Sequence, residues 1–211
     1  MASGRDSPRA QQPARRGPRA RQLRIIAGSW RGRRLRFPDV PQIRPTPDRV
    51  RETLFNWLGE RIRGARCLDL FAGSGALGLE ALSRGARAVE FVECHGASAR
   101  ALAQLLRAWG AGADCAAVHT GDALAWLQRP ARPFDVVFLD PPFGSDLLPR
   151  AARELDARGW LSPGALIYVE CPAREGLPAL PAAWQPLKEK RSGEVGYHLF
   201  ERLRAPGEPD P

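Results

Sequence analysis

The residues with the most specific chemistry stand in the run Asp140-Pro141-Pro142-Phe143, directly after an apolar stretch at residues 134–139. Two prolines fix the backbone and remove two N–H donors, so the run offers only a carboxylate and carbonyls as acceptors. Two acceptors can hold the exocyclic amine of a nucleobase in line with an electrophile. Phe143 can stack on the base, with about 1–3 kcal/mol per stacked base. The run predicts a site that modifies a base amine; the alternative is a proline-rich loop with a core phenylalanine.

A glycine-rich turn at residues 69–78 (DLFAGSGALG) is the second candidate site. Gly73 and Gly75 allow a tight turn close to a ligand, and Gly78 allows a helix to pack against a strand. Glu93 follows 20 residues after Gly73, where an acid binds ribose hydroxyls, although acids are also favoured at helix starts. Dehydrogenases and methyltransferases share this pattern, so the turn predicts a nucleotide-like cofactor without choosing one.

Asp122 follows a glycine at the end of another apolar stretch. It could accept a hydrogen bond from the adenine amine of the cofactor. It could equally cap the helix that it begins, and the sequence favours neither role over the other.

Short apolar stretches that alternate with helical patterns must position these side chains. Near-continuous apolar strands separated by helices predict a parallel sheet covered on both faces, with ligands at the carboxyl ends of its strands. The last two strands, joined by Arg191-Ser192-Gly193-Glu194, predict an antiparallel hairpin. The expected strands are 67–71, 88–93, 116–120, 134–140, 166–170, 184–190 and 195–203, and the expected helices are 77–83, 97–109, 123–127 and 147–158.

Before the sheet, residues 23–37 alternate basic and apolar residues around glycines, which predicts two short basic strands. Thr46 and Pro47 predict a capped helix start, followed by an apolar face. That face contains Val50, Leu54, Trp57 and Leu58.

The positive charge lies in the first quarter of the chain. The net charge is +9, and residues 1–51 hold 14 Arg against three Asp. Such a segment typically binds polyanions, because phosphate contacts supply most non-specific nucleic-acid affinity. A solvated tail without a partner is the alternative.

Several absences define the expected compartment. No apolar stretch is long enough to span a bilayer, so we expect a cytoplasmic protein that does not bind membranes. Four cysteines form no C-x-x-C pair and the three histidines are scattered, which indicates neither a disulfide framework nor a metal site.

Several motifs in order resemble the bacterial RsmD family of 16S ribosomal RNA guanine-N2 methyltransferases. The similarity covers residues 23–204 and implies an α/β, Rossmann-like class I S-adenosylmethionine-dependent methyltransferase fold. Its mostly parallel seven-stranded sheet would end in an antiparallel hairpin, with a small N-terminal hairpin and helix extension. The matching segments are 24–28 (RIIAG), 30–33 (WRGR), 44–46 (RPT), 48–58 (DRVRETLFNWL), 68–75 (LDLFAGSG) and 140–143 (DPPF).

Composition and the extent of the resemblance together predict the organisation of the chain. Residues 1–22 would be a disordered basic tail, 23–45 an RNA-binding hairpin extension, 46–204 the methyltransferase domain and 205–211 a disordered C-terminus. We assign a set of basic and aromatic residues to RNA, although single members could be surface or core residues. The set is Trp30, Arg31, Arg33, Arg34, Arg36, Arg44, Arg49 and Arg51.

By resemblance, S-adenosylmethionine would be the methyl donor. Asp69, Gly73 and Gly75 would border its methionine part, Glu93 its ribose and Asp122 its adenine. Phe71 and Ala123 would also contact it.

For the target base, the resemblance implies that Asp140 and the Pro141 carbonyl hold the guanine amine, with Pro142 and Phe143 completing the site. The expected reaction is direct in-line methylation of N2 of guanine 966 of 16S rRNA, in an assembling 30S subunit, by a monomer. Three alternatives remain open: a DNA adenine-N6 or cytosine-N4 methyltransferase, an NAD-dependent dehydrogenase, and a non-catalytic RNA-binding protein.

Overall fold

The computed structural model describes residues 21–37 and 46–204. The predictions for residues 1–20 of the basic tail, for the end of the chain after residue 204 and for Arg44 concern residues outside these described ranges. The tail was predicted to extend to residue 22, but Arg21 and Gln22 already pair in the first strand, so that boundary is wrong.

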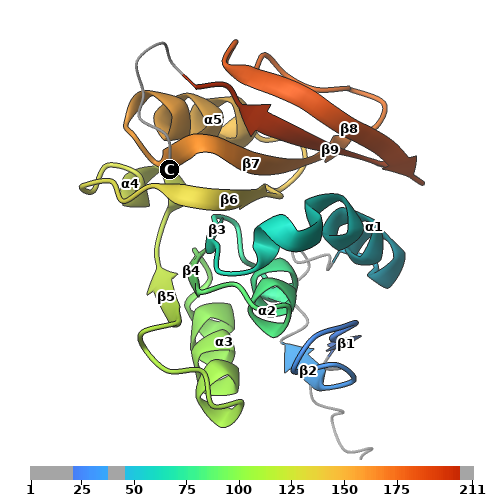
Figure 1. Ribbon diagram of the computed structural model, residues 1–211, viewed down its shortest axis with the longest axis vertical. Helices are drawn as coiled ribbons and strands as arrows, with labels where there is room; N and C mark the ends of the chain where they lie inside the picture. Colours follow the sequence, from blue (N-terminus) through green and yellow to red (C-terminus); the bar gives the residue numbers. More distant parts are fainter. Residues whose placement is uncertain (1–20, 38–45, 205–211) are drawn as a thin grey trace, which may run out of the picture.

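A seven-stranded sheet with the order β5-β4-β3-β6-β7-β9-β8 organises the protein (Figure 1). β3 to β7 run parallel, and β9 is antiparallel to both of its neighbours. The predicted mostly parallel sheet with a final antiparallel hairpin is confirmed. The strands are β3 (Arg66–Asp69), β4 (Ala88–Glu93), β5 (Ala116–Thr120), β6 (Phe134–Leu139), β7 (Leu161–Pro172), β8 (Trp184–Ser192) and β9 (Val195–Arg202).

Helices cover both faces of this sheet. In β6, Val136 and Phe138 pack in one apolar cluster, while Val137 and Leu139 pack in the other. The first cluster contains α1, α2 and α3, and the second contains α4 and α5, which lie on opposite sides of the sheet in Figure 1. The helices are α1 (Asp48–Leu58), the short 3₁₀ helix η1 (Gly59–Ile62), α2 (Ala76–Ser83), α3 (Gly96–Ala108), α4 (Ala123–Trp126) and α5 (Leu147–Ala157).

The two predicted basic strands are β1 (Arg21–Arg24) and β2 (Arg34–Phe37), which pair antiparallel. Alternation with period two sends Leu23 and Leu35 inward, into the same cluster as α1, α2 and α3. Arg34 and Arg36 of β2 are exposed. The hairpin therefore shares the core of the sheet and turns its arginines outward.

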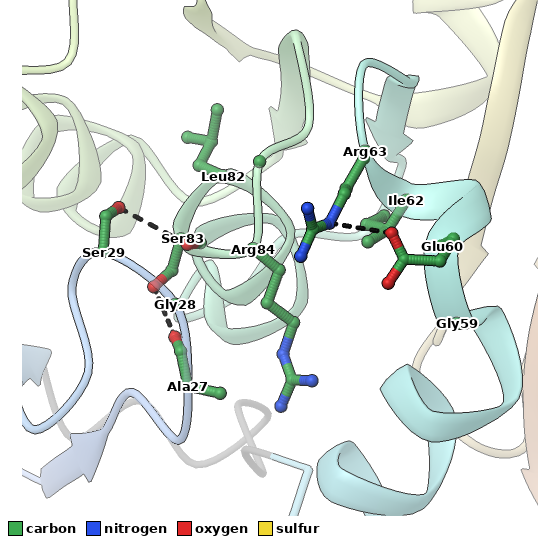
Figure 2. A pocket seen from close by; sticks show the side chains of 11 residues that line it. Ala27, Gly28, Ser29, Gly59, Glu60, Ile62, Arg63, Leu82, Ser83 and Arg84 are labelled. Atoms are coloured by element: carbon green, nitrogen blue, oxygen red, sulfur yellow. Dashed lines mark hydrogen bonds and ion pairs between the residues drawn. The ribbon is translucent and has the colours of Figure 1, made fainter.

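The loop between β1 and β2 is fixed to the end of α2 at Ser83, as Figure 2 shows. The Ser83 hydroxyl donates to the carbonyl oxygen of Ala27, and the Ser29 N–H donates to the Ser83 carbonyl oxygen at 2.7 Å. Gly28 has a φ of +83°, and a Cβ there would lie 1.8 Å from that same carbonyl oxygen. Only glycine fits this approach. A cavity of about 460 Å³ separates the loop from η1.

Arg51 does not face RNA, so that part of the prediction is wrong. Its side chain is fully buried, and its guanidinium pairs with Glu80 at 3.5 Å and with Asp48, and donates to the Arg24 carbonyl oxygen at 2.9 Å. Glu80 also accepts from the N–H groups of Ile26 and Ala27. Since a buried charge requires partners, Arg51 serves to join α1, α2 and the hairpin.

Candidate active site

A cavity of about 740 Å³ opens at the carboxyl ends of β3, β4 and β6, where an open α/β sheet is expected to bind its ligand. Among the described residues, no Lys or Arg lines it. Its lining carries six acids: Asp69, Glu93, Asp122, Asp140, Glu170 and Glu194. Such a lining favours a cationic ligand and opposes the anionic pyrophosphate of NAD.

The glycine turn connects β3 to α2 as predicted. Gly73 and Gly75 have positive φ angles of 54° and 77°, which favour glycine. A Cβ on Gly78 would lie 2.2 Å from the Phe91 ring, so this glycine allows α2 to pack close to β4. Phe71, in the same turn, is half-buried and lines the cavity.

Asp69 ends β3 and is buried. Its carboxylate accepts one hydrogen bond, from the Gly78 N–H at 3.0 Å, and forms no ion pair with a described residue. Burial, which has the largest effect, and the charge of Glu93 together raise the pKa of Asp69 to about 7, against the opposite effect of the Gly78 hydrogen bond. A carboxylate in this state is suited to an ammonium group of a ligand.

Glu93 ends β4 and joins it to the glycine turn. One carboxylate oxygen accepts from the Gly73 N–H at 2.7 Å, and the other accepts from the His95 N–H at 2.7 Å. Ligand atoms of Glu93, Cys94 and His95 lie within 4.8 Å of one another, a spacing suited to a metal ion. The two backbone hydrogen bonds, one to each oxygen, fix the orientation of the Glu93 carboxylate at the cavity.

Asp122 performs the capping role that the sequence left open. Its Oδ1 accepts from the Ala125 N–H at 2.8 Å at the start of α4. Asp122 and the buried Ala123 also line the cavity, so the expected adenine contact remains compatible with the cap and stays a prediction.

The run that follows β6 places its acceptors at the cavity. Asp140 is partly buried and Pro141 is buried, and both line the cavity. The Pro142 carbonyl is engaged by the Ser145 hydroxyl at 2.7 Å, whereas the Pro141 carbonyl receives no hydrogen bond from a described residue. Phe143 is 46% exposed, so the core alternative for this residue is wrong.

Glu170 in β7 is a site residue that the sequence reasoning missed. It is buried, lines the cavity and accepts through Oε1 from the Tyr168 hydroxyl at 2.8 Å and the Thr46 hydroxyl at 3.0 Å. The predicted capping role of Thr46 is therefore wrong: α1 begins after Pro47 without a side-chain cap. The available signal was an acid at the end of an expected strand.

Asp140 and Glu170 influence each other. Burial, then the charge of Glu170, then that of Asp69, raise the pKa of Asp140 well above its usual value. Burial also raises the pKa of Glu170, while hydrogen bonds from Tyr168 and Thr46 act in the opposite direction. Two such carboxylates are matched to a ligand that brings several N–H donors.

The described members of the proposed RNA-binding set differ in exposure. Arg31, Arg34, Arg36 and Arg49 are exposed and form no ion pair with a described residue. Trp30 is half-buried and packs edge-on against Trp109 at a centroid distance of 5.2 Å. The guanidinium of Arg33, although exposed, lies 5.6 Å from the centre of the Trp109 ring.

The sheet order, the final hairpin and the cavity at the glycine turn define a class I methyltransferase fold. Residues 23–201 match the family model "Conserved hypothetical protein 95". The ribosomal RNA small subunit methyltransferase D of Escherichia coli K12 is 49% identical over 189 residues, which cover 90% of this chain and 94% of that protein. The chain therefore belongs to the RsmD family.

Solved structures agree with this assignment. A putative methyltransferase, yhhF, from Escherichia coli superposes with a TM-score of 0.80 at 48% identity, covering 86% of this chain and 98% of that one. The Thermus thermophilus 16S rRNA N2-guanine methyltransferase RsmC, in complex with AdoMet and guanosine, gives a TM-score of 0.62 at 28% identity, covering 88% of this chain and 50% of that one. The dehydrogenase alternative is wrong. Within the described residues, no helix is both long and apolar enough to cross a membrane.

Proposed function

We propose that this protein transfers a methyl group from S-adenosylmethionine to the N2 amine of a guanine in 16S rRNA, by direct in-line displacement. The observation that carries the proposal is the acceptor edge formed by Asp140 and the Pro141 carbonyl in an acidic cavity. The names of the relatives support rRNA as the substrate class, and the resemblance supports guanine 966. The protein would act as a monomer on an assembling 30S subunit in the cytoplasm.

The cavity fits the proposed cofactor. Asp69, buried and without a cation among the described residues, would hold the ammonium of the methionine part. Glu93 would accept from the ribose hydroxyls through its remaining lone pairs, and Asp122 would accept from the adenine amine through its second oxygen. When bound, S-adenosylmethionine supplies an electrophilic methyl group on a sulfonium, so the enzyme needs no covalent intermediate.

The chain's main contribution to the reaction is positioning. The target guanine would leave its stack and enter the cavity, where the exposed Phe143 ring stacks on it. Asp140 and the Pro141 carbonyl accept the two N–H groups of N2 and direct its lone pair toward the donor. Such positioning can lower a barrier by about 7–11 kcal/mol. After transfer, the Asp140 carboxylate receives the proton that N2 loses.

The basic hairpin, together with Arg49 of α1, would hold the surrounding RNA. The exposed arginines Arg31, Arg34, Arg36 and Arg49 would contact phosphates, and Arg33 with Trp30 would present a mixed cationic and aromatic surface beside α3. Arg51 is not part of this surface because it is buried.

A labelled-methyl assay with unmodified 30S subunits, naked 16S rRNA and duplex DNA tests the proposal. We expect label in RNA alone, and mass mapping should place it on N2 of one guanine. Asp140→Asn should lose at least about 100-fold in rate while S-adenosylhomocysteine binding persists. Label in DNA would favour the DNA methyltransferase alternative. No label in any substrate would favour the non-catalytic alternative.

A further inference from the structure

One carboxylate oxygen of Glu170 has no hydrogen-bond donor among the described residues. Oε1 receives the hydroxyls of Tyr168 and Thr46, whereas Oε2 receives no hydrogen bond from a described residue. The side chain is 4% exposed and lines the cavity together with Asp140. Because the side chain is almost fully buried and still lines the cavity, the lone pairs of Oε2 are available to a donor that a ligand brings into the cavity.

The two hydroxyls also fix the orientation of this carboxylate. Tyr168 lies two residues before Glu170 on β7, and Thr46 approaches from the segment before α1, 124 residues away in sequence. Because both donors bind the same oxygen, the carboxylate cannot rotate without losing two hydrogen bonds. Oε2 is therefore held as an acceptor at the cavity.

Guanine presents two kinds of donor side by side on its Watson–Crick edge, the N2 amine and the neighbouring N1–H. Asp140 and Pro141 provide acceptors for the amine alone, and every other base amine would satisfy them equally. Adenine and cytosine have an acceptor, not a donor, on the ring nitrogen beside their amine. A second carboxylate beside Asp140 distinguishes guanine from these bases.

We propose that Glu170 is the residue that selects guanine, by accepting the N1–H of the target base at Oε2 while Asp140 and the Pro141 carbonyl hold its N2 amine. This inference rests on the proposed function, since it concerns the base that enters the same cavity. Adenine or cytosine would turn a lone pair toward this carboxylate, and the repulsion would exclude them. A site built to bind an N–H group typically rejects the analogue that lacks it by a large factor.

The experiment replaces the mapped target guanine, in otherwise unmodified 16S rRNA, by 2-aminopurine or by 6-thioguanine. 2-Aminopurine keeps the 2-amine but has an acceptor at N1, and 6-thioguanine keeps the N1–H while changing the group at C6. We expect the wild-type protein to methylate guanine and 6-thioguanine within about 10-fold of each other, and 2-aminopurine at least about 100-fold more slowly.

Glu170→Gln provides the matched exchange, because Tyr168 and Thr46 hold the amide oxygen and the amide N–H then faces the base. The guanine to 2-aminopurine ratio of kcat/KM should fall at least 10-fold in this variant. Glu175→Gln, the same exchange on an exposed residue outside the cavity, should leave the ratio unchanged.

The possible failures are distinguishable. If the wild-type protein methylates no guanine in rRNA, the proposed function fails. If it methylates guanine and 2-aminopurine equally well, or if Glu170→Gln keeps the wild-type ratio while losing overall activity, the proposed function stands and the role of Glu170 in base selection is refuted. The wild-type comparison does not depend on whether the variant folds.

Discussion

Asp69→Asn should stabilise the free protein while it weakens donor binding. In the folded chain the pKa of Asp69 is raised from 3.8 to about 7, so folding favours the protonated carboxyl. The protonated Asp69 carboxyl therefore adds fully to the free energy of unfolding below about pH 4. This contribution is lost as the pH rises toward 7, because the unfolded chain ionises first and the folded protein then ionises as well. Asparagine, which is always neutral and can still accept from the Gly78 N–H, avoids this loss.

The size of the effect follows from the two pKa values, at 1.36 kcal/mol per unit. Relative to the wild type, the variant should gain about 4 kcal/mol of unfolding free energy at pH 8 but only about 2 kcal/mol at pH 5. Urea unfolding followed by tryptophan fluorescence at both pH values measures this difference. Calorimetry should show that S-adenosylhomocysteine binds the variant about 10- to 100-fold more weakly, because a charge-assisted hydrogen bond is lost.

Asp114→Asn, the same exchange on an exposed loop residue outside the cavity, is the control and should change neither property. If Asp69→Asn gives the same gain at pH 5 and pH 8, the burial of an uncompensated acid is not the cause and the reasoning fails.

Three further expectations concern the attachment and the use of the hairpin. Gly28→Ala should destabilise the protein by about 2–4 kcal/mol and weaken RNA binding, because its Cβ would clash with the Ser83 carbonyl. Gly32→Ala is the control: it has a similar φ of +81° but lies in open space, so it measures the cost of the backbone conformation without the clash. Equal losses of stability for the two variants in urea unfolding would contradict this account. Arg51→Ala should lower the free energy of unfolding by about 3–5 kcal/mol in the same assay, because it leaves the buried Glu80 with fewer partners. Arg49→Ala, at an exposed position, should change it by no more than about 0.5 kcal/mol. A larger loss for Arg49→Ala than for Arg51→Ala would place Arg51 at the surface. The logarithm of RNA affinity should fall with the logarithm of salt concentration, and Arg34→Ala with Arg36→Ala should reduce the slope by about 1–2; a slope that is flat in the wild type would remove the hairpin from the RNA interface.

The sequence predicted the sheet well because its signals are local. The near-continuous apolar run of β6, interrupted only by Asp135, indicated a strand buried on both faces, and it is buried against a separate cluster on each face. Since parallel strands end at one edge, Asp69, Glu93 and Asp140 could be expected together, and all three line one cavity.

The errors involve partners that are distant in sequence. From the sequence alone Arg51 is interpreted as a surface arginine, but α2 places Glu80 against it. Thr46 is likewise interpreted as a helix cap, but β7 places Glu170 within hydrogen-bond distance of it. The hairpin turn was also expected to be longer: β8 continues to Ser192, so that only Gly193 and Glu194 separate the last two strands. Composition and periodicity cannot reveal such long-range pairs.

Helix α2 has a consequence for the kind of RNA that the protein can accept. It starts after Gly75 in the glycine turn and ends at Ser83, where the hairpin loop is attached, so its eight residues, a length of about 12 Å, connect the glycine turn at the cavity to the basic hairpin. Neither end can shift, because Gly28 is pressed against Ser83 and Gly78 against β4. Under the proposed function, α2 therefore holds the methyl-transfer cavity and the basic hairpin in a fixed relative position. The protein would accept a guanine that the folded RNA presents in the cavity while the hairpin binds phosphates of the same RNA. The shape of the assembling particle, more than the neighbouring bases, would then decide which guanine is methylated.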